Sequence, residues 1–175
     1  MRILETRRHS MRAIPSPHLT QAGVDLARRI GSTIGPFDRV VTSTLPRAFE
    51  TAIAMGFAVD EQFDALSMIA AGVEDEINWD SGFAEWARVI KQGGAAARFA
   101  QMQADILRSI VRALPDGGRA LVISHGGIVE AGAIGCLLPD IPPIGGTPCS
   151  YCEGARLKFE GDRVVKFEIL RASNA

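Results

Sequence analysis

Residues 2–12 read RILETRRHSMR, and this stretch predicts a first strand over residues 2–8 with His9 just beyond its end. Far along the chain, residues 120–127 read ALVISHGG, an apolar run that predicts another strand and ends in His125-Gly126-Gly127. One histidine therefore follows each of two predicted strands. In open α/β sheets, ligands bind outside the carboxyl ends of the strands. The two stretches together predict a ligand site at that edge of a sheet.

The first half of the chain alternates predicted helices and strands. Thr20 is expected to cap a helix whose apolar side chains share one face, and Gly35-Pro36 is expected to stop that helix. A second strand is predicted over residues 38–42. Thr44 is expected to cap the next helix, with Pro46 in its first turn and Gly56 near its end. The apolar face of the earlier helix is expected to hold Leu26, Ala27, Ile30 and Ile34.

The second half continues the alternation. A short third strand is expected at 57–61, irregular chain at 63–80, two helices separated by Gly93-Gly94, a strand at 119–123, a helix reaching about Leu138, a loop at 139–148, and two strands around 160–162. This pattern predicts a single domain over residues 1–175, a three-layer α/β/α sandwich with a mostly parallel sheet.

The overall composition excludes some classes of protein. The 175 residues are 47% hydrophobic and 22% charged, and the formal net charge is -1, so no marked basic excess points to nucleic-acid binding. No apolar run approaches the roughly 20 residues that a membrane span needs. Charged residues interrupt the N-terminal stretch where a signal peptide would be apolar. We therefore expect a cytoplasmic protein that binds neither nucleic acid nor membranes.

The three cysteines are Cys136, Cys149 and Cys152. Three cysteines do not form a disulfide framework in a chain of this size. Cys149 and Cys152 make a C-x-x-C spacing, but no second pair or nearby histidine completes a zinc site, and the spacing does not open a helix as a redox motif would. We expect no metal and no cofactor.

Strand ends deliver a set of basic side chains that suits a phosphoryl group. Arg8 and His9 follow the first strand, Arg47 lies in the helical turn after the second, and His125 follows the later one. Positioned cations stabilise the charge on a phosphoryl group in flight, and a neutral histidine can accept that group. Neighbouring arginines favour the neutral imidazole by repulsion of like charges. Gly126 and Gly127, at a helix start, can offer backbone N–H groups to an anion.

Four blocks in order resemble the histidine phosphatase superfamily, which includes the cofactor-dependent phosphoglycerate mutases. They are Arg8-His9, then Leu19-Thr20-x-x-Gly23, then Ser43-x-x-x-Arg47-Ala48-x-x-Thr51-Ala52, then Ser124-His125-Gly126. The resemblance implies an α/β/α fold and a metal-free phosphatase with a phosphohistidine intermediate. In such an enzyme His9 would attack phosphorus, while Arg8, Arg47 and His125 would bind the phosphoryl oxygens and a carboxylic acid would protonate the leaving group.

The chain departs from the family pattern beside His9. The family usually has glycine after the nucleophile, where this chain has Ser10, a change that is tolerable if the backbone there does not need a positive φ. Residues 11–14 read MRAI, whereas the mutase and bisphosphatase branches continue with Thr or Ser and an Asn. This departure disfavours a phosphoglycerate mutase. Arg12 either extends the basic pocket or is a solvated side chain.

The acid departs from the family pattern as well. The family's glutamate falls at Met68 in the stretch from Leu66 to Gly72, and methionine cannot transfer a proton. Glu74 is the candidate acid, with Asp75, Glu76 or no residue at all as alternatives. Substrates with good leaving groups, phosphohistidine among them, would depend less on that proton.

Two hypotheses follow. The first is a phosphatase acting on a small phosphomonoester or a phosphoprotein carrying phosphohistidine. The second is a phosphate-binding protein of the same fold without catalysis. Residues 64–100, with Trp79 and Trp86, and the loop at 139–148 are expected to rim the pocket. The substrate and the oligomeric state are left open.

Overall fold

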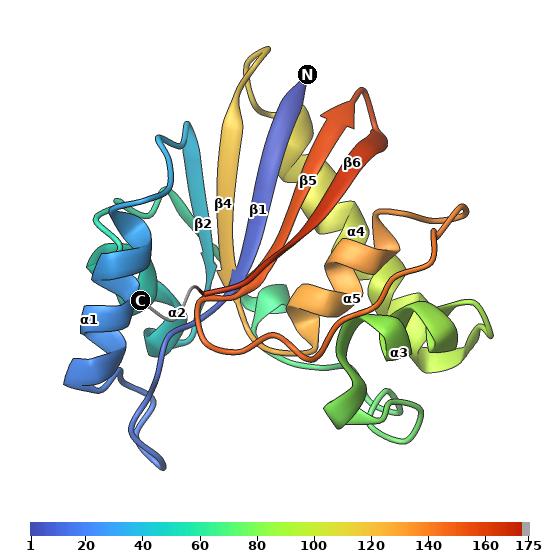
Figure 1. Ribbon diagram of the computed structural model, residues 1–175, viewed down its shortest axis with the longest axis horizontal. Coiled ribbons are helices and arrows are strands. Elements are labelled where there is room, and N and C mark those ends of the chain that lie inside the picture. Colours follow the sequence, from blue (N-terminus) through green and yellow to red (C-terminus); the bar gives the residue numbers. More distant parts are fainter. Residues whose placement is uncertain (173–175) are drawn as a thin grey trace.

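The computed structural model describes residues 1–172, and its elements alternate along the chain as in Figure 1. The helices and strands are β1 (Arg2–Arg8), α1 (Gln21–Gly31), β2 (Arg39–Ser43), α2 (Pro46–Ala54), β3 (Glu61–Phe63), α3 (Gly82–Ile90), α4 (Gly94–Arg112), β4 (Arg119–Ser124), α5 (Ile128–Gly135), β5 (Gly154–Glu160) and β6 (Arg163–Leu170). Two short 3-10 helices, Asp64–Leu66 and Trp79–Ser81, interrupt the irregular stretch expected at 63–80.

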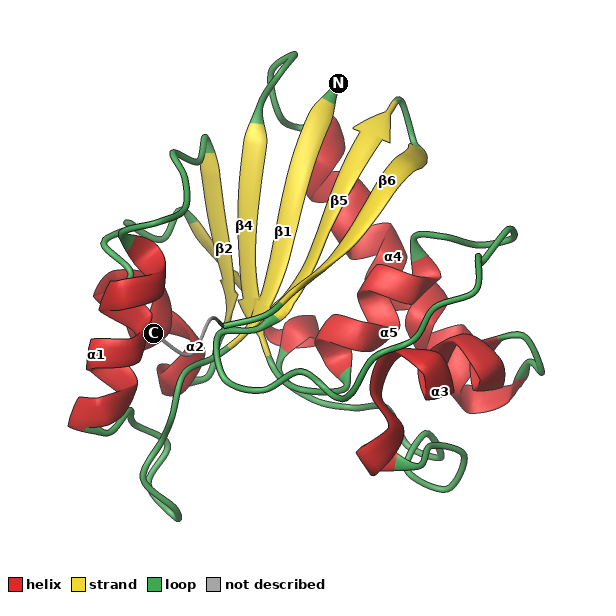
Figure 2. Ribbon diagram, in the orientation of Figure 1, coloured by secondary structure: helices red, strands yellow, loops and turns green. Residues whose placement is uncertain are grey.

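The strands form one sheet in the order β3-β2-β4-β1-β5-β6. The pairs β3–β2, β2–β4 and β4–β1 are parallel, while β5 runs antiparallel to both β1 and β6. Helices α1 and α2 cover one face, and α3, α4 and α5 lie on the other side (Figure 2). The predicted mostly parallel α/β/α sandwich is therefore confirmed.

The central strand β4 shows why the sheet is buried on both faces. Its side chains alternate between the faces, so Val122 joins the core under α4 and α5 while Leu121 and Ile123 join the core under α1 and α2. A near-continuous apolar run is what a strand covered on both sides requires.

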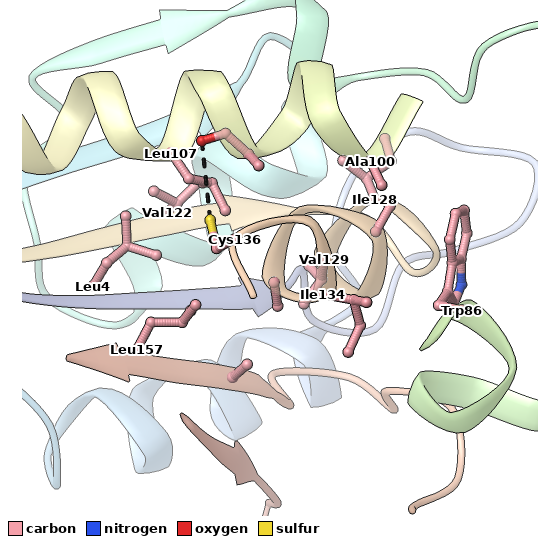
Figure 3. Close-up of a cluster of buried hydrophobic side chains, with 14 of the residues drawn as sticks. Leu4, Trp86, Ala100, Leu107, Val122, Ile128, Val129, Ile134, Cys136 and Leu157 are labelled. Carbon is pink, nitrogen blue, oxygen red and sulfur yellow. Dashed lines mark hydrogen bonds between the residues drawn. The ribbon is translucent and has the colours of Figure 1, made fainter. Parts of the chain in front are cut away.

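The larger core lies between the sheet and the helices α3, α4 and α5. Figure 3 shows Leu4, Val122 and Leu157, from three different strands, facing Leu107 of α4 and Ile134 of α5. All eight residues of α5 are buried, and apart from Glu130 they are apolar or glycine, as a helix covered on all sides requires.

The central strand β1 contains charged residues because they neutralise one another. The Glu5 side chain has no exposed surface, and its carboxylate accepts hydrogen bonds from Arg7 at 2.9 Å and Arg156 at 2.9 Å. Arg119 contacts the same carboxylate at 3.4 Å. A buried charge is tolerated when it is paired and hydrogen-bonded in this way.

Two helices end earlier than the sequence predicts. Helix α1 ends at Gly31, before Ile34, since the Ser32 and Thr33 hydroxyls donate to the carbonyls of Arg29 and Ile30. Helix α5 ends at Gly135 rather than near Leu138, followed by the cap residue Cys136.

Two further predictions near β2 were wrong. Thr44 does not cap α2, whose N-cap is Leu45; the Thr44 hydroxyl donates to Asp64 instead, at 2.9 Å. The third strand is Glu61–Phe63 rather than 57–61, because Phe57 and Val59 pack into the core under α1 and α2. Within residues 1–172, no helix is long and apolar enough to cross a membrane.

Candidate active site

The sheet register places the two histidines side by side. Strands β1 and β4 are parallel neighbours, and Arg8 pairs with Ser124 at their carboxyl ends. His9 and His125 follow directly, and their ring centroids lie 5.1 Å apart. Both side chains are buried. The predicted meeting of these two residues at one edge of the sheet is confirmed.

The hydrogen bonds of His9 fix which nitrogen is free to react. Its Nδ1 lies 2.7 Å from the carbonyl oxygen of Ser10. Because a carbonyl oxygen only accepts hydrogen bonds, Nδ1 carries the hydrogen and Nε2 keeps its lone pair. Arg47, in the first turn of α2, donates its Nε–H to that Nε2 at 3.2 Å. The nitrogen with the lone pair therefore faces a cation.

Motif residues that do no chemistry hold the loop after β1. The Ser10 N–H donates to the Thr51 hydroxyl at 2.9 Å, and the Ser10 hydroxyl donates to the Gly23 carbonyl at 2.7 Å. A Cβ on Gly23 would lie 2.1 Å from the carbonyl oxygen of Met11, so only glycine fits there. Thr20 caps α1 through the Gly23 N–H, as predicted. Ser10 is not among the residues with positive φ, so its replacement of glycine causes no backbone strain.

His125 is oriented by the end of β2. Its Nε2 lies 2.7 Å from the Ser43 hydroxyl, whereas its Nδ1 is buried and has no hydrogen-bond partner within the described chain. A buried ring nitrogen without a partner is costly, which makes it a candidate to bind a ligand.

Arg8 is held on several sides. Its Nη1 donates to the carbonyl of Cys149 at 2.8 Å, and its guanidinium carbon lies 4.7 Å from the centre of the Tyr151 ring. A Cβ on Gly126 would lie 3.4 Å from the Arg8 Nε, an ordinary contact distance, so the turn after β4 lies beside the guanidinium. That Nε is buried, again with no hydrogen-bond partner in the part of the chain that the structure describes.

These residues surround a cavity of about 400 Å³. It joins the predicted site residues to side chains from the expected rim, Trp79, Trp86 and Pro148. The full lining is Arg8, His9, Arg12, Ile14, Arg47, Trp79, Gly82, Trp86, His125, Gly126, Gly127, Glu130, Pro148, Cys149 and Tyr151. Arg12 therefore extends the basic pocket. His18 lies outside it, where it is paired with Glu50.

Burial and the arginines keep both imidazoles neutral. Burial lowers the pKa of His9 to about 4, and the charges of Arg47, Arg8 and Arg12 act in the same direction, while the hydrogen bond to Ser10 opposes them. Burial likewise lowers the pKa of His125 to about 3, with His9 and the same arginines contributing. At neutral pH the cavity thus offers unprotonated nitrogens beside permanent cations.

The structure does not bring the expected acid to the cavity. Glu74 and Asp75 are exposed and do not line it, and Met68 is 76% exposed. The neighbouring Glu76 faces the start of α4, where its carboxylate accepts hydrogen bonds from the N–H groups of Ala95 and Ala96 at 2.8 and 2.9 Å. That contact anchors the acidic cluster away from His9.

The carboxylate that does line the cavity is Glu130, which the sequence analysis missed. Its oxygens accept the N–H of Gly127 at 2.7 Å and the N–H of Cys149 at 2.8 Å. It thereby ties the turn after β4 to the loop before β5, and it leaves Gly126 rather than Gly127 to offer an N–H to an anion. The sequence does contain a sign of this contact. Glu130 lies three residues after the N-cap Gly127, the spacing at which a glutamate side chain reaches back to the N-cap N–H.

Tyr151 was missed as well, because nothing in its local sequence points to Arg8. The turn that carries it is tied to the loop after β1, since the Cys152 N–H donates to the Arg8 carbonyl at 3.1 Å. The thiols of Cys149 and Cys152 are buried in the cores on opposite faces of the sheet, and burial raises the pKa of both. Among residues 1–172, no group of three or more His, Cys, Asp or Glu side chains could hold a metal ion.

Comparisons with known proteins identify the family of the chain. The family model "Histidine phosphatase superfamily (branch 1)" matches residues 5–169. Phosphoserine phosphatase from Entamoeba histolytica, in complex with 3-phosphoglyceric acid, superposes with a TM-score of 0.70 at 18% identity, covering 98% of each chain. Mycobacterial glucosyl-3-phosphoglycerate phosphatase with VO3 gives 0.68 at 18% identity, covering 99% of this chain and 100% of that one.

A third similar structure is the protein histidine phosphatase SixA with tungstate, with a TM-score of 0.59 at 16% identity and 96% of each chain covered. At such identities the likeness shows the fold. No curated protein sequence matches the chain. The family model, however, spans nearly all of it. The protein therefore belongs to the histidine phosphatase superfamily, branch 1.

Proposed function

We propose that the protein is a metal-independent phosphatase that acts through a phosphohistidine at His9. The observation that carries this proposal is the His9 imidazole, whose Nδ1–H is bonded to the Ser10 carbonyl and whose Nε2 lone pair meets Arg47 at 3.2 Å. A neutral imidazole among guanidinium groups combines a nucleophile with a clamp for the charge of the transferring group.

The reaction has two steps. In the first, the His9 Nε2–P bond forms as the bond between phosphorus and the leaving oxygen breaks. In the second, a water molecule attacks phosphorus, the P–N bond breaks and orthophosphate leaves. Arg8, Arg47 and His125 bind the phosphoryl oxygens throughout, and the Gly126 N–H adds a further donor. The unpartnered buried atoms Arg8 Nε and His125 Nδ1 support this assignment.

The substrate is a small phosphomonoester or a protein phosphohistidine, and its leaving group takes a proton from water. The positions of Glu74, exposed and outside the cavity, and of Glu130, with both oxygens bonded to backbone N–H groups, support this route. The same positions favour one alternative, a phosphate-binding protein without turnover.

The test is hydrolysis of p-nitrophenyl phosphate in excess EDTA, with His9→Ala beside the wild type. We expect turnover in the wild type, a loss of roughly a thousandfold or more in His9→Ala, and an acid-labile phosphoenzyme in the wild type alone. His18→Ala is the matched control, because its imidazole lies outside the cavity, and it should retain full activity. Phosphate binding without turnover in the wild type would favour the alternative.

A further inference from the structure

Beside its cations and imidazoles, the cavity is lined by flat or apolar side chains. They come from segments that are far apart in the sequence: Ile14, then Trp79 and Trp86, then Pro148 and Tyr151. Trp86 is buried, whereas Trp79 keeps 41% of its surface exposed and Ile14 keeps 78%. Large apolar side chains that remain exposed beside a polar site are typical of a surface that contacts a ligand.

The Trp79 indole is fixed against the turn that carries His125. A Cβ on Gly127 would lie 2.5 Å from the Trp79 ring, so the indole rests directly on the glycine backbone. The ring also meets Trp86 edge to face, with centroids 6.1 Å apart. Gly82, just after Trp79, packs so closely on the Thr147–Pro148 backbone that a Cβ there would lie within 2.4 Å of it. The exposed part of the indole is therefore held in one position.

A second ring lies beside the nucleophile. The centroid of Tyr151 is 6.0 Å from that of His9, and its face covers Arg8 at 4.7 Å. The Trp79 and Tyr151 rings line the same cavity as the cations and imidazoles. A leaving group bonded to a phosphoryl group at His9 therefore lies in a cavity that contains both rings. Aromatic faces and edges favour contact with another ring.

We propose that the substrates are aromatic phosphate esters, whose ring contacts Trp79 while the phosphoryl group is held by Arg8, Arg47 and His125. This inference rests on the proposed function and narrows its substrate class. In the first step the electron pair of the breaking P–O bond goes to a phenolic oxygen, which then takes a proton from water. A phenol has a pKa of about 10, far below the roughly 15.7 of water. A phenolate therefore leaves with less help from an acid than an oxyanion as basic as hydroxide would need. That suits a cavity whose carboxylate, Glu130, is bonded to backbone N–H groups.

The test separates ring contact from leaving-group chemistry by using phosphonates, which cannot be hydrolysed. Benzylphosphonate and cyclohexylmethylphosphonate have the same charge and nearly the same size, but only the first is flat. Their Kd values are measured by calorimetry on the wild type, Trp79→Phe and Trp79→Leu, together with that of inorganic phosphate. We expect the wild type to prefer the aromatic ligand by about fivefold, the scale of one ring–ring contact.

Trp79→Phe, which keeps a flat ring, should retain that preference, and Trp79→Leu should lose it. Phosphate affinity should be equal in all three proteins, because the cationic floor does not change. Equal binding of the two phosphonates by the wild type would overturn the inference, as would a preference that survives in Trp79→Leu. Tighter binding of imidazolylmethylphosphonate than of benzylphosphonate would overturn it in favour of a phosphohistidine substrate.

Failure of the proposed function gives a different result. In that case p-nitrophenyl phosphate is not hydrolysed, or His9→Ala hydrolyses it as well as the wild type does, whatever the two phosphonates show.

Discussion

At the scale of the residue, the site depends on side chains that hold Arg8 in place as much as on those that react. The Arg8 guanidinium donates one hydrogen bond to the Cys149 carbonyl, lies beside the turn of Gly126 and faces the Tyr151 ring at 4.7 Å. A cation held over an aromatic face loses less freedom when it binds a phosphoryl oxygen. The position of this arginine therefore depends on a turn that lies at least 141 residues further along the chain.

We predict that Tyr151→Leu weakens phosphate binding by about two- to fivefold, the scale of a partly exposed cation–π contact, and lowers kcat. Tyr151→Phe keeps the ring and should behave like the wild type. Tyr151 is the only tyrosine among the 175 residues, so 3-fluorotyrosine labelling gives a single fluorine resonance that should shift when phosphate binds. A loss in Tyr151→Phe as large as that in Tyr151→Leu would mean that the hydroxyl matters instead of the ring.

Site residues that follow strand ends could be predicted from the sequence, whereas site residues contributed by distant segments of the chain could not. His9 and His125 were found because each comes directly after a recognisable strand, and Arg47 because it opens the helix after another. Tyr151 acts through its contact with Arg8, on a distant segment, and local pattern carries no information about such a contact. Glu130 accepts the Gly127 N–H three residues back, which its spacing does signal, and also the Cys149 N–H nineteen residues further on, which its spacing does not signal.

At the scale of the element, close helix contacts set the position of the turn after β4. Helix α5 follows that turn directly and packs on α4. At Gly135 a Cβ would lie 2.3 Å from the carbonyl oxygen of Ala100, so the two backbones touch there. The apolar character of α5 could be read from the sequence, but this crossing could not, because a glycine near a helix end also predicts a cap.

We predict that Gly135→Ala lowers the free energy of unfolding by about 1–3 kcal/mol, the range for overpacking a core, because α5 must move away from α4. Gly145→Ala is the matched control, since a Cβ there meets nothing within 4 Å. Urea denaturation followed by circular dichroism measures both. Equal urea midpoints for Gly135→Ala and Gly145→Ala would contradict the prediction, because α5 would then move away from α4 without a loss of free energy of unfolding.

The boundaries of helices and strands were predicted less well than their existence, again because tertiary contacts decide them. Thr44 carries the right chemistry for a helix cap, yet its hydroxyl is taken by Asp64, twenty residues further on. Residues 57–61 have a strand-like composition, yet Phe57 and Val59 fill the core under α1 and α2, and pairing with β2 begins only at Glu61. In each case a tertiary contact decided between two locally reasonable conformations.

At the scale of the whole molecule, the parallel strands bring the reactive groups to one edge and the helices on both faces bury them there. Burial is the largest cause of the low pKa values of His9 and His125, about 4 and about 3. The same packing that stabilises the sandwich therefore keeps the nucleophile unprotonated. A consequence is that stability and proton binding are linked.

We predict that the free energy of unfolding falls as the pH is lowered from 7 to 5. In the unfolded chain both imidazoles have pKa values near 6.5 and take up protons in this range, whereas in the folded protein they stay neutral until about pH 4 and 3. Proton binding thus favours the unfolded chain. The stability that the two neutral imidazoles contribute above pH 6.5 is lost progressively as the pH falls toward their pKa values in the folded protein. Each histidine contributes a slope of up to about 1.4 kcal/mol per pH unit.

Urea unfolding at pH 7, 6 and 5 without phosphate measures this slope. Most carboxylates remain ionised in that range, so the histidines dominate it. His9→Asn should remove about half of the slope, and the double variant His9→Asn/His125→Asn should remove most of it. An unchanged slope in the double variant would contradict the prediction, because it would mean that the folded protein does not hold these rings neutral below pH 6.5.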